Sequence, residues 1–90
     1  MPVTFVIPHS WHSITAITVL QCDAASVSEA LTWFGQQYPV LRERIFTADN
    51  RLAPWTVVCL EGTDVRSLGG LDTAIEKPTE LQIIPALMGG

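Results

Sequence analysis

The last ten residues of the chain decide its architecture, and they run Leu81-Gln82-Ile83-Ile84-Pro85-Ala86-Leu87-Met88-Gly89-Gly90. Their first half is typical of a β-strand, because leucine and isoleucine side chains pack well on a pleated sheet. The proline should end this strand, since it has no N–H to donate to a central ladder. The sequence therefore predicts a hydrophobic strand followed directly by a short tail.

The Gly89-Gly90 pair permits two interpretations. One is a frayed end without a role. The other is a tail that threads into a second protein, because a glycine backbone passes through a channel too narrow for any side chain. The four residues Leu87–Gly90, fully extended, reach at most about 14 Å. On the second interpretation they form a flexible tail that delivers the Gly90 carboxylate to another protein's active site.

Length and composition limit the class of protein. Ninety residues allow one domain with one core, which we expect to span residues 1–90. A hydrophobic content of 48% with only 16% charged residues excludes a disordered chain. The net charge of −4 and the scattered basic residues argue against a nucleic-acid partner. No apolar run reaches membrane-spanning length, no signal peptide is evident, and two cysteines make no disulfide scaffold, so a cytoplasmic location is expected.

One long amphipathic helix is predicted after residue 25. Ser26 is followed three residues later by Glu29, which is the spacing of a capping box. Pro39 should end the helix, and a short helical turn should cover 40–46. The apolar residues at spacings of three and four share one face of this helix: Val27, Ala30, Leu31, Phe34 and Tyr38.

The remaining segments alternate as strands do, which gives the order β-β-α-β-β-β. A hairpin, a helix packed on the sheet and a late strand beside the first define a β-grasp. We therefore expect an α+β, ubiquitin-like fold with a mixed sheet of four to five strands and one main helix. Ahead of the last strand, the predicted strands are Val3–Pro8, Ile14–Leu20, Trp55–Leu60 and a short one at Val65 and Arg66.

Several motifs in the last third of the chain are specific. They are Asp64-Val65-Arg66, Gly69-Gly70-Leu71-Asp72-Thr73-Ala74-Ile75, Ile83-Ile84-Pro85 and the final Gly89-Gly90. With the predicted element order, the chain resembles the ThiS/MoaD family of ubiquitin-like sulfur carriers. The first two motifs carry a closer resemblance to the cysteine-biosynthesis, CysO-like branch. Met88 departs from the family, whose members often have a small residue before the final diglycine.

The resemblance implies a protein-borne sulfur donor that is no enzyme, with no catalytic residue and no cofactor of its own. An E1-like adenylating enzyme of the MoeB/ThiF type would use ATP to activate the Gly90 carboxylate. A sulfur donor such as a rhodanese-like protein would then convert it to a thiocarboxylate. In the CysO-like branch the acceptor would be a cysteine-synthase-like enzyme carrying pyridoxal phosphate, and a metalloprotease would release cysteine. Gly89, Met88 and Leu87 would thread into partner sites, with Pro85 as a further guide.

Other functions of the same family stay open at this point. One is a ubiquitin-like modifier whose Gly90 is joined to lysines of target proteins. Another is the small subunit of a molybdopterin-synthase-like complex. Among sulfur carriers, the acceptor leads to cysteine, molybdopterin, thiazole or a secondary metabolite.

No other side-chain cluster is expected to carry chemistry. His9 and His12 form a His-x-x-His pair, but no third ligand stands near them, so no metal site is predicted. Cys59 should be a buried small hydrophobe in its strand, and Cys22 should follow a strand and be accessible. Neither cysteine has a basic or histidine neighbour that would mark a nucleophile.

The three tryptophans are expected in different surroundings. Trp11 lies in a polar turn and should be exposed, which would suit a partner contact. Trp33 lies off the main apolar face of the helix and should cover a loop. Trp55 begins a strand and should lie partly in the core.

Overall fold

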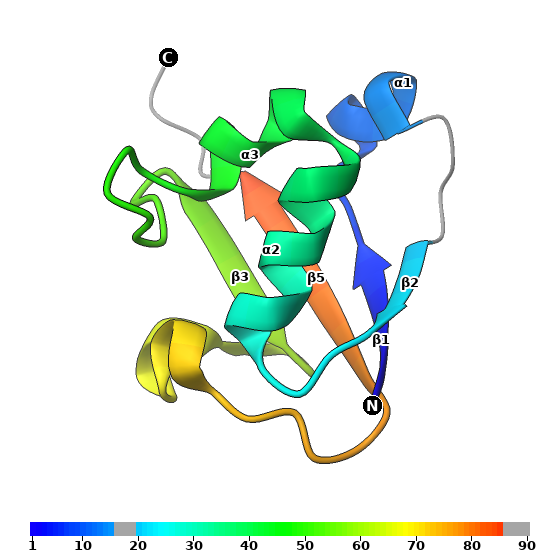
Figure 1. Ribbon diagram of the computed structural model, residues 1–90, viewed down its shortest axis with the longest axis vertical. Coiled ribbons are helices and arrows are strands. Elements are labelled where there is room, and N and C mark those ends of the chain that lie inside the picture. Colours follow the sequence, from blue (N-terminus) through cyan, green and yellow to red (C-terminus); the bar gives the residue numbers. More distant parts are fainter. Residues whose placement is uncertain (16–19, 86–90) are drawn as a thin grey trace.

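The computed structural model describes residues 1–15 and 20–85 of the chain (Figure 1). Its strands are β1 (Pro2–Val6), β2 (Leu20–Asp23), β3 (Thr56–Leu60), β4 (Thr63–Asp64) and β5 (Thr79–Pro85). Its helices are α1 (His12–Thr15), α2 (Val27–Gln37) and α3 (Pro39–Ile45), and the 3-10 turns are η1 (His9–Trp11), η2 (Val65–Ser67) and η3 (Gly70–Asp72).

One mixed sheet organises these elements in the order β2-β1-β5-β3-β4. The last strand, β5, lies in the middle, parallel to β1 and antiparallel to β3. α2 crosses one face of the sheet between the β1–β2 pair and the later strands (Figure 1). This arrangement confirms the predicted β-grasp, with five strands and one main helix.

The capped helix forms as its sequence predicts. The Ser26 hydroxyl oxygen accepts a hydrogen bond of 3.1 Å from the backbone N–H of Glu29, which satisfies one of the free donors at the helix start. Leu31 and Phe34 are both fully buried on its inner face. The Phe34 ring lies 5.3 Å from Phe5, centroid to centroid, which joins the helix to β1 in one aromatic core. Pro39 ends α2 and also opens α3, where its missing N–H costs nothing.

The prediction for residues 9–20 was wrong in two respects. Ile14 and Thr15, expected in a strand, belong to α1, and Leu20 is the first described residue of β2. Residues 16–19 of the predicted strand lie outside the described residues. Trp11, expected to be exposed, is 3% exposed, because η1 turns its ring onto Phe34 with centroids 6.3 Å apart. Alternating β-branched residues favour a strand locally, but here the buried Trp11 ends one helical turn and α1 follows directly.

The predicted strand at Val65 and Arg66 was also misplaced. The strand is Thr63–Asp64, and the next three residues form η2. The Asp64 carboxylate accepts a hydrogen bond of 2.9 Å from the Arg66 backbone N–H. Such a side-chain cap starts a helical turn and competes with the strand ladder.

Candidate functional site

The predicted site residues Leu87, Met88, Gly89 and Gly90 lie outside the described residues, so their roles stay predictions. The structure does describe the strand that leads to them. Pro85 is the last residue of β5 and pairs with Thr56, the first residue of β3. This end of the central strand lies at the same end of the molecule as α3 (Figure 1).

Hydrogen bonds from two neighbouring elements fix the start of β3. The Arg66 guanidinium donates to the carbonyl oxygens of Thr56 at 3.0 Å and of Ala53 at 2.6 Å. The Thr56 hydroxyl donates to the backbone carbonyl of Arg44 in α3. The strand that pairs with Pro85 is therefore tied to η2 on one side and to α3 on the other. Arg66 belongs to a motif that supported the family resemblance, but its role in holding this strand was not predicted.

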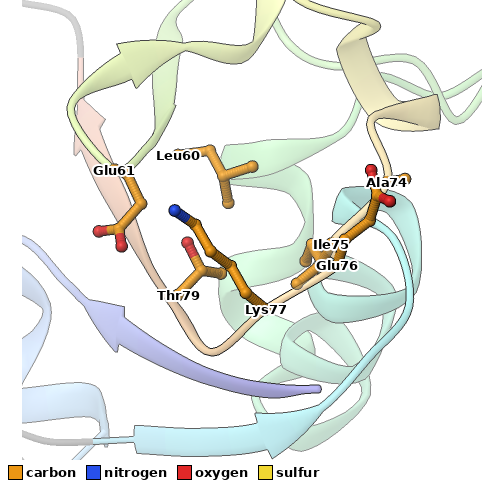
Figure 2. Close-up of a pocket in the computed structure, with 7 residues that line it drawn as sticks. All are labelled: Leu60, Glu61, Ala74, Ile75, Glu76, Lys77 and Thr79. Atoms are coloured by element: carbon orange, nitrogen blue, oxygen red, sulfur yellow. The ribbon is translucent and has the colours of Figure 1, made fainter.

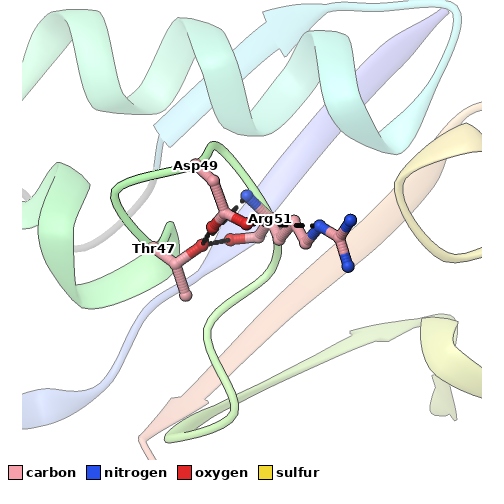
Figure 3. Close-up of polar contacts among 3 residues, drawn as sticks. All are labelled: Thr47, Asp49 and Arg51. Atoms are coloured by element: carbon pink, nitrogen blue, oxygen red, sulfur yellow. Dashed lines mark hydrogen bonds and ion pairs between the residues drawn. The ribbon is translucent and has the colours of Figure 1, made fainter.

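Side chains of the loop between α3 and β3 form polar contacts within the loop, as Figure 3 shows. The Thr47 hydroxyl donates to the Asp49 carboxylate and accepts a 3.2 Å hydrogen bond from the Arg51 backbone N–H. The Thr47 hydroxyl, the backbone N–H of Asp49 and the nearby Arg51 together hold the pKa of the Asp49 carboxyl below its usual value. These contacts order the segment that precedes Trp55.

Apolar side chains are exposed where β5 ends. Trp55 and Ile84 are each 39% exposed. Ile84 pairs in register with Val57, which is half-buried. We call Trp55, Val57, Ile84 and Pro85 the exit surface. Exposed aromatic and aliphatic side chains are common in protein-binding sites.

One prediction about the exit surface was wrong, and one of its residues was not predicted. Trp55, expected partly in the core, is exposed beside a hollow of about 380 Å³ that also contains Arg42 and Phe46. Trp33 packs against the core, with its ring 5.8 Å from Phe5. Ile84 was not predicted as a surface residue, although the signal was present. Successive strand residues face opposite sides, so a buried Ile83 requires Ile84 to point away from the core.

The cysteines differ from their predicted surroundings. Cys22 lies within β2 and is half-buried against the core, and Cys59 is half-buried in β3 where full burial was expected. Burial raises the pKa of the Cys22 thiol, and the carboxylates of Asp23 and Glu29 raise that pKa further. The Cys22 thiolate, which is the form that carries sulfur chemistry, is therefore disfavoured at neutral pH.

The two histidine side chains lie close together. The rings of His9 and His12 meet edge to face with centroids 5.0 Å apart. Within residues 1–15 and 20–85, no group of three or more His, Cys, Asp or Glu side chains is placed to hold a metal ion. In the same two segments, no helix has the length and apolar character needed to cross a membrane.

Comparison with known proteins identifies the family. The model of the ThiS family matches residues 12–90. The chain belongs to the ThiS family. Members of this family are small ubiquitin-like carriers and modifiers. They act as protein carriers rather than as catalysts. A search of curated proteins found no match.

Solved structures of this ThiS-family fold are similar over nearly the whole chain. A chain of the Amycolatopsis orientalis BexX/CysO complex is 26% identical, with a TM-score of 0.85 and coverage of 98% of this chain and 99% of that one. Mycobacterium tuberculosis CysO is 24% identical, with a TM-score of 0.82 and coverage of 94% and 99%. The small archaeal modifier protein 1 of Methanosarcina acetivorans is 22% identical, with a TM-score of 0.86 and coverage of 99% and 96%. The predicted likeness to CysO is confirmed.

Proposed function

We propose that this ThiS-family protein is a sulfur carrier whose Gly90 carboxylate is converted to a thiocarboxylate. The observation that carries the proposal is the family match, which extends through residue 90 and so includes the diglycine. The 26% identity with a chain of the BexX/CysO complex supports a CysO-like carrier. For such a carrier, the acceptor that we propose is a cysteine-synthase-like enzyme.

The chemistry requires activation, because a carboxylate is a poor electrophile. A Gly90 carboxylate oxygen attacks the α-phosphorus of ATP on an E1-like enzyme of the MoeB/ThiF type, and pyrophosphate leaves. The outer sulfur of a persulfide on a rhodanese-like donor then attacks the acyl carbon, and AMP leaves with the oxygen. A thiol cleaves the resulting acyl disulfide and is itself oxidised to a disulfide. Free hydrosulfide can replace both steps, because it attacks the acyl carbon and gives the thiocarboxylate directly. The product is a thiocarboxylate, and the carrier itself supplies no acid, base or cofactor to any of these steps.

The geometry at the end of β5 supports delivery of this group to a partner. Five residues follow Pro85, and fully extended they reach at most about 18 Å. A carrier can therefore remain on a partner's surface while its carboxylate enters the partner's active site. The exit surface supplies the contact beside that entrance, since Trp55 and Ile84 present apolar area where the last strand ends.

Intact-protein mass spectrometry tests the proposal. Incubation with a MoeB/ThiF-type enzyme, ATP and sulfide should raise the mass of the intact protein by the difference between one sulfur atom and one oxygen atom. A chain that lacks Gly90 should show no gain. A Cys22→Ser, Cys59→Ser double variant should gain sulfur as the wild type does. If the Gly90 deletion still gained sulfur and the double-cysteine variant did not, a cysteine rather than Gly90 would be the carrying residue and the proposal would fail.

The same spectra separate the carrier from a protein modifier. A modifier forms amide-linked conjugates that are heavier by a whole target protein, whereas a carrier accumulates as a free chain with exchanged sulfur. The structures of archaeal modifiers are 22% identical or less to this chain and share its fold. The CysO chains, at 24–26% identity, share the same fold, so the masses of the products decide between carrier and modifier.

A further inference from the structure

A hollow lies at the opposite end of β5 from the exit surface. It has a volume of about 270 Å³ and lies between the β3–β4 turn and the segment that leads into β5. Ile75 and Thr79 are buried and Leu60 is half-buried, so apolar atoms contribute much of its floor. Charged side chains stand on its rim, and its full lining is Leu60, Glu61, Ala74, Ile75, Glu76, Lys77 and Thr79.

The positively charged Lys77 side chain lies at the rim of this hollow. It is the single lysine of the chain and is exposed. In the part of the chain that the structure describes, the ion pairs are Met1–Asp23 and Asp49–Arg51, so the Lys77 ammonium has no carboxylate partner there. Figure 2 shows its amine between Leu60 and Glu61, with the Glu61 carboxylate turned outward and that of Glu76 on the far side near Ala74.

A cation above an apolar floor selects a particular ligand chemistry. The floor favours an aliphatic side chain, because burial removes its apolar surface from water. The ammonium favours a carboxylate close to that side chain. A ligand that offers both groups within one short segment fits better than a free anion or a purely apolar peptide.

We propose that this hollow binds the C-terminal segment of a second copy of the chain, with its Gly90 carboxylate paired to Lys77. The inference rests on the proposed function, in which Gly90 ends in a free carboxylate. The segment has the required chemistry, since Leu87 and Met88 are aliphatic and two glycines separate them from the carboxylate. Two extended residues span at most about 7 Å, which keeps the carboxylate near the seated side chain.

The occupant is a second copy because a chain's own tail is too short. β5 has seven residues and is about 20 Å long, and the hollow lies at its start. The five residues after Pro85 reach at most about 18 Å, so they fall short of the hollow of their own chain. Docking between copies would keep the Gly90 carboxylate from the activating enzyme. The docked fraction would rise with the concentration of the carrier.

A peptide titration tests the site directly. The probe is the acetylated hexapeptide Pro-Ala-Leu-Met-Gly-Gly with a free carboxylate, added to isotope-labelled protein and followed by NMR. Shifts should cluster at residues 60–61 and 74–79. The C-terminal carboxamide should bind about two- to five-fold more weakly, which is the range of one exposed ion pair. Equal affinity of the two peptides, or shifts centred on the exit surface, would overturn the proposal.

Two variants and a scrambled peptide complete the experiment. Lys77→Gln should weaken the free acid to the level of the carboxamide and leave the carboxamide unchanged. Arg44→Gln, which removes an exposed cation elsewhere, should change neither. A scrambled peptide, in which the glycines are moved away from the C-terminus, should bind more weakly. Equal binding would show that the hollow accepts any peptide with a free carboxylate, against the proposal.

Failure of this inference and failure of the proposed function give different results. Lys77 lies far from the exit surface. The Lys77→Gln variant should therefore gain sulfur at Gly90 as fast as the wild type in a dilute reaction. Sulfur gain without peptide binding overturns the hollow alone. Peptide binding without sulfur gain overturns the carrier function, and the hollow then stands as a site for carboxylate-ended segments.

Discussion

Thr56 pairs with Pro85 at the last position of the β3–β5 ladder, directly before the segment that carries the diglycine. The Arg66 guanidinium donates to the Thr56 carbonyl, and the Thr56 hydroxyl donates to α3. The point at which the last strand ends is therefore held by contacts on both sides. A carrier needs such a fixed point, because a short tail reaches a partner's active site only from a defined position.

Replacement of Arg66 tests this arrangement. Arg66→Ala should lower the free energy of unfolding by about 1–3 kcal/mol, since two carbonyl oxygens lose a charged donor. Amide hydrogen exchange at the start of β3 should accelerate at the same time. Arg51→Ala removes an exposed ion pair instead, and in urea unfolding it should cost no more than about 1 kcal/mol. Equal effects of the two changes would show that Arg66 does not stabilise this strand.

The aromatic core should dominate stability. Phe34→Ala should cost about 3–5 kcal/mol, because Phe34 is fully buried and its ring contacts Phe5 and Trp11. Urea denaturation measures the loss. Thr32→Ala, on the exposed side of the same helix, should change stability by less than about 0.5 kcal/mol. An unchanged midpoint for the Phe34 variant would contradict the assigned helix face.

The contrast between these regions explains what the sequence could predict. The α2 helix was predictable because Ser26 and a regular apolar spacing determine it locally. The last strand and the β-grasp order followed from short apolar runs and from the loops between them. Trp11 was misplaced because its polar neighbours suggested exposure, whereas contact with Phe34, distant in sequence, buries it.

The site was only partly predictable for a similar reason. Motif spacing pointed to the diglycine, but no local pattern shows that Arg66 reaches the carbonyls of Ala53 and Thr56. The exposure of Trp55 depends on how the preceding loop folds, which the contacts of Asp49 and Arg51 decide. Tertiary contacts, rather than local sequence preferences, set these positions.

The exit surface should determine partner affinity. Trp55→Ala and Ile84→Ser should each raise the KM for the carrier in the adenylation reaction about ten-fold or more, since exposed aromatic anchors often contribute most of the binding energy. Both variants should remain folded, because each side chain is already 39% exposed. Leu68→Ala, which removes an exposed leucine from η2's end, should leave KM unchanged. Equal KM values for all three variants would exclude this surface as the docking site.

Cys22 should react slowly with alkylating reagents at neutral pH. Burial, Asp23 and Glu29 raise its pKa, so the reactive thiolate becomes abundant only above the usual pH range of a thiol. Iodoacetamide labelling in a Cys59→Ala background, measured across pH, should show this displacement. Asp23→Asn removes a negative charge and should therefore lower the pKa and raise the rate at pH 8. A faster rate than that of free cysteine at pH 7 would contradict the assignment.

Gly89 should tolerate no β-branched side chain. Gly89→Val should abolish sulfur gain at Gly90, because valine both fills a narrow channel and restricts the backbone that must pass through it. Stability in urea should not change, since a glycine has no side chain to contribute to the core. Met88→Ala should reduce the rate less, because a flexible thioether that only lines a groove can be replaced. Intact-mass spectra at fixed times measure all three chains, and a wild-type rate for Gly89→Val would mean that the carboxylate is activated without threading.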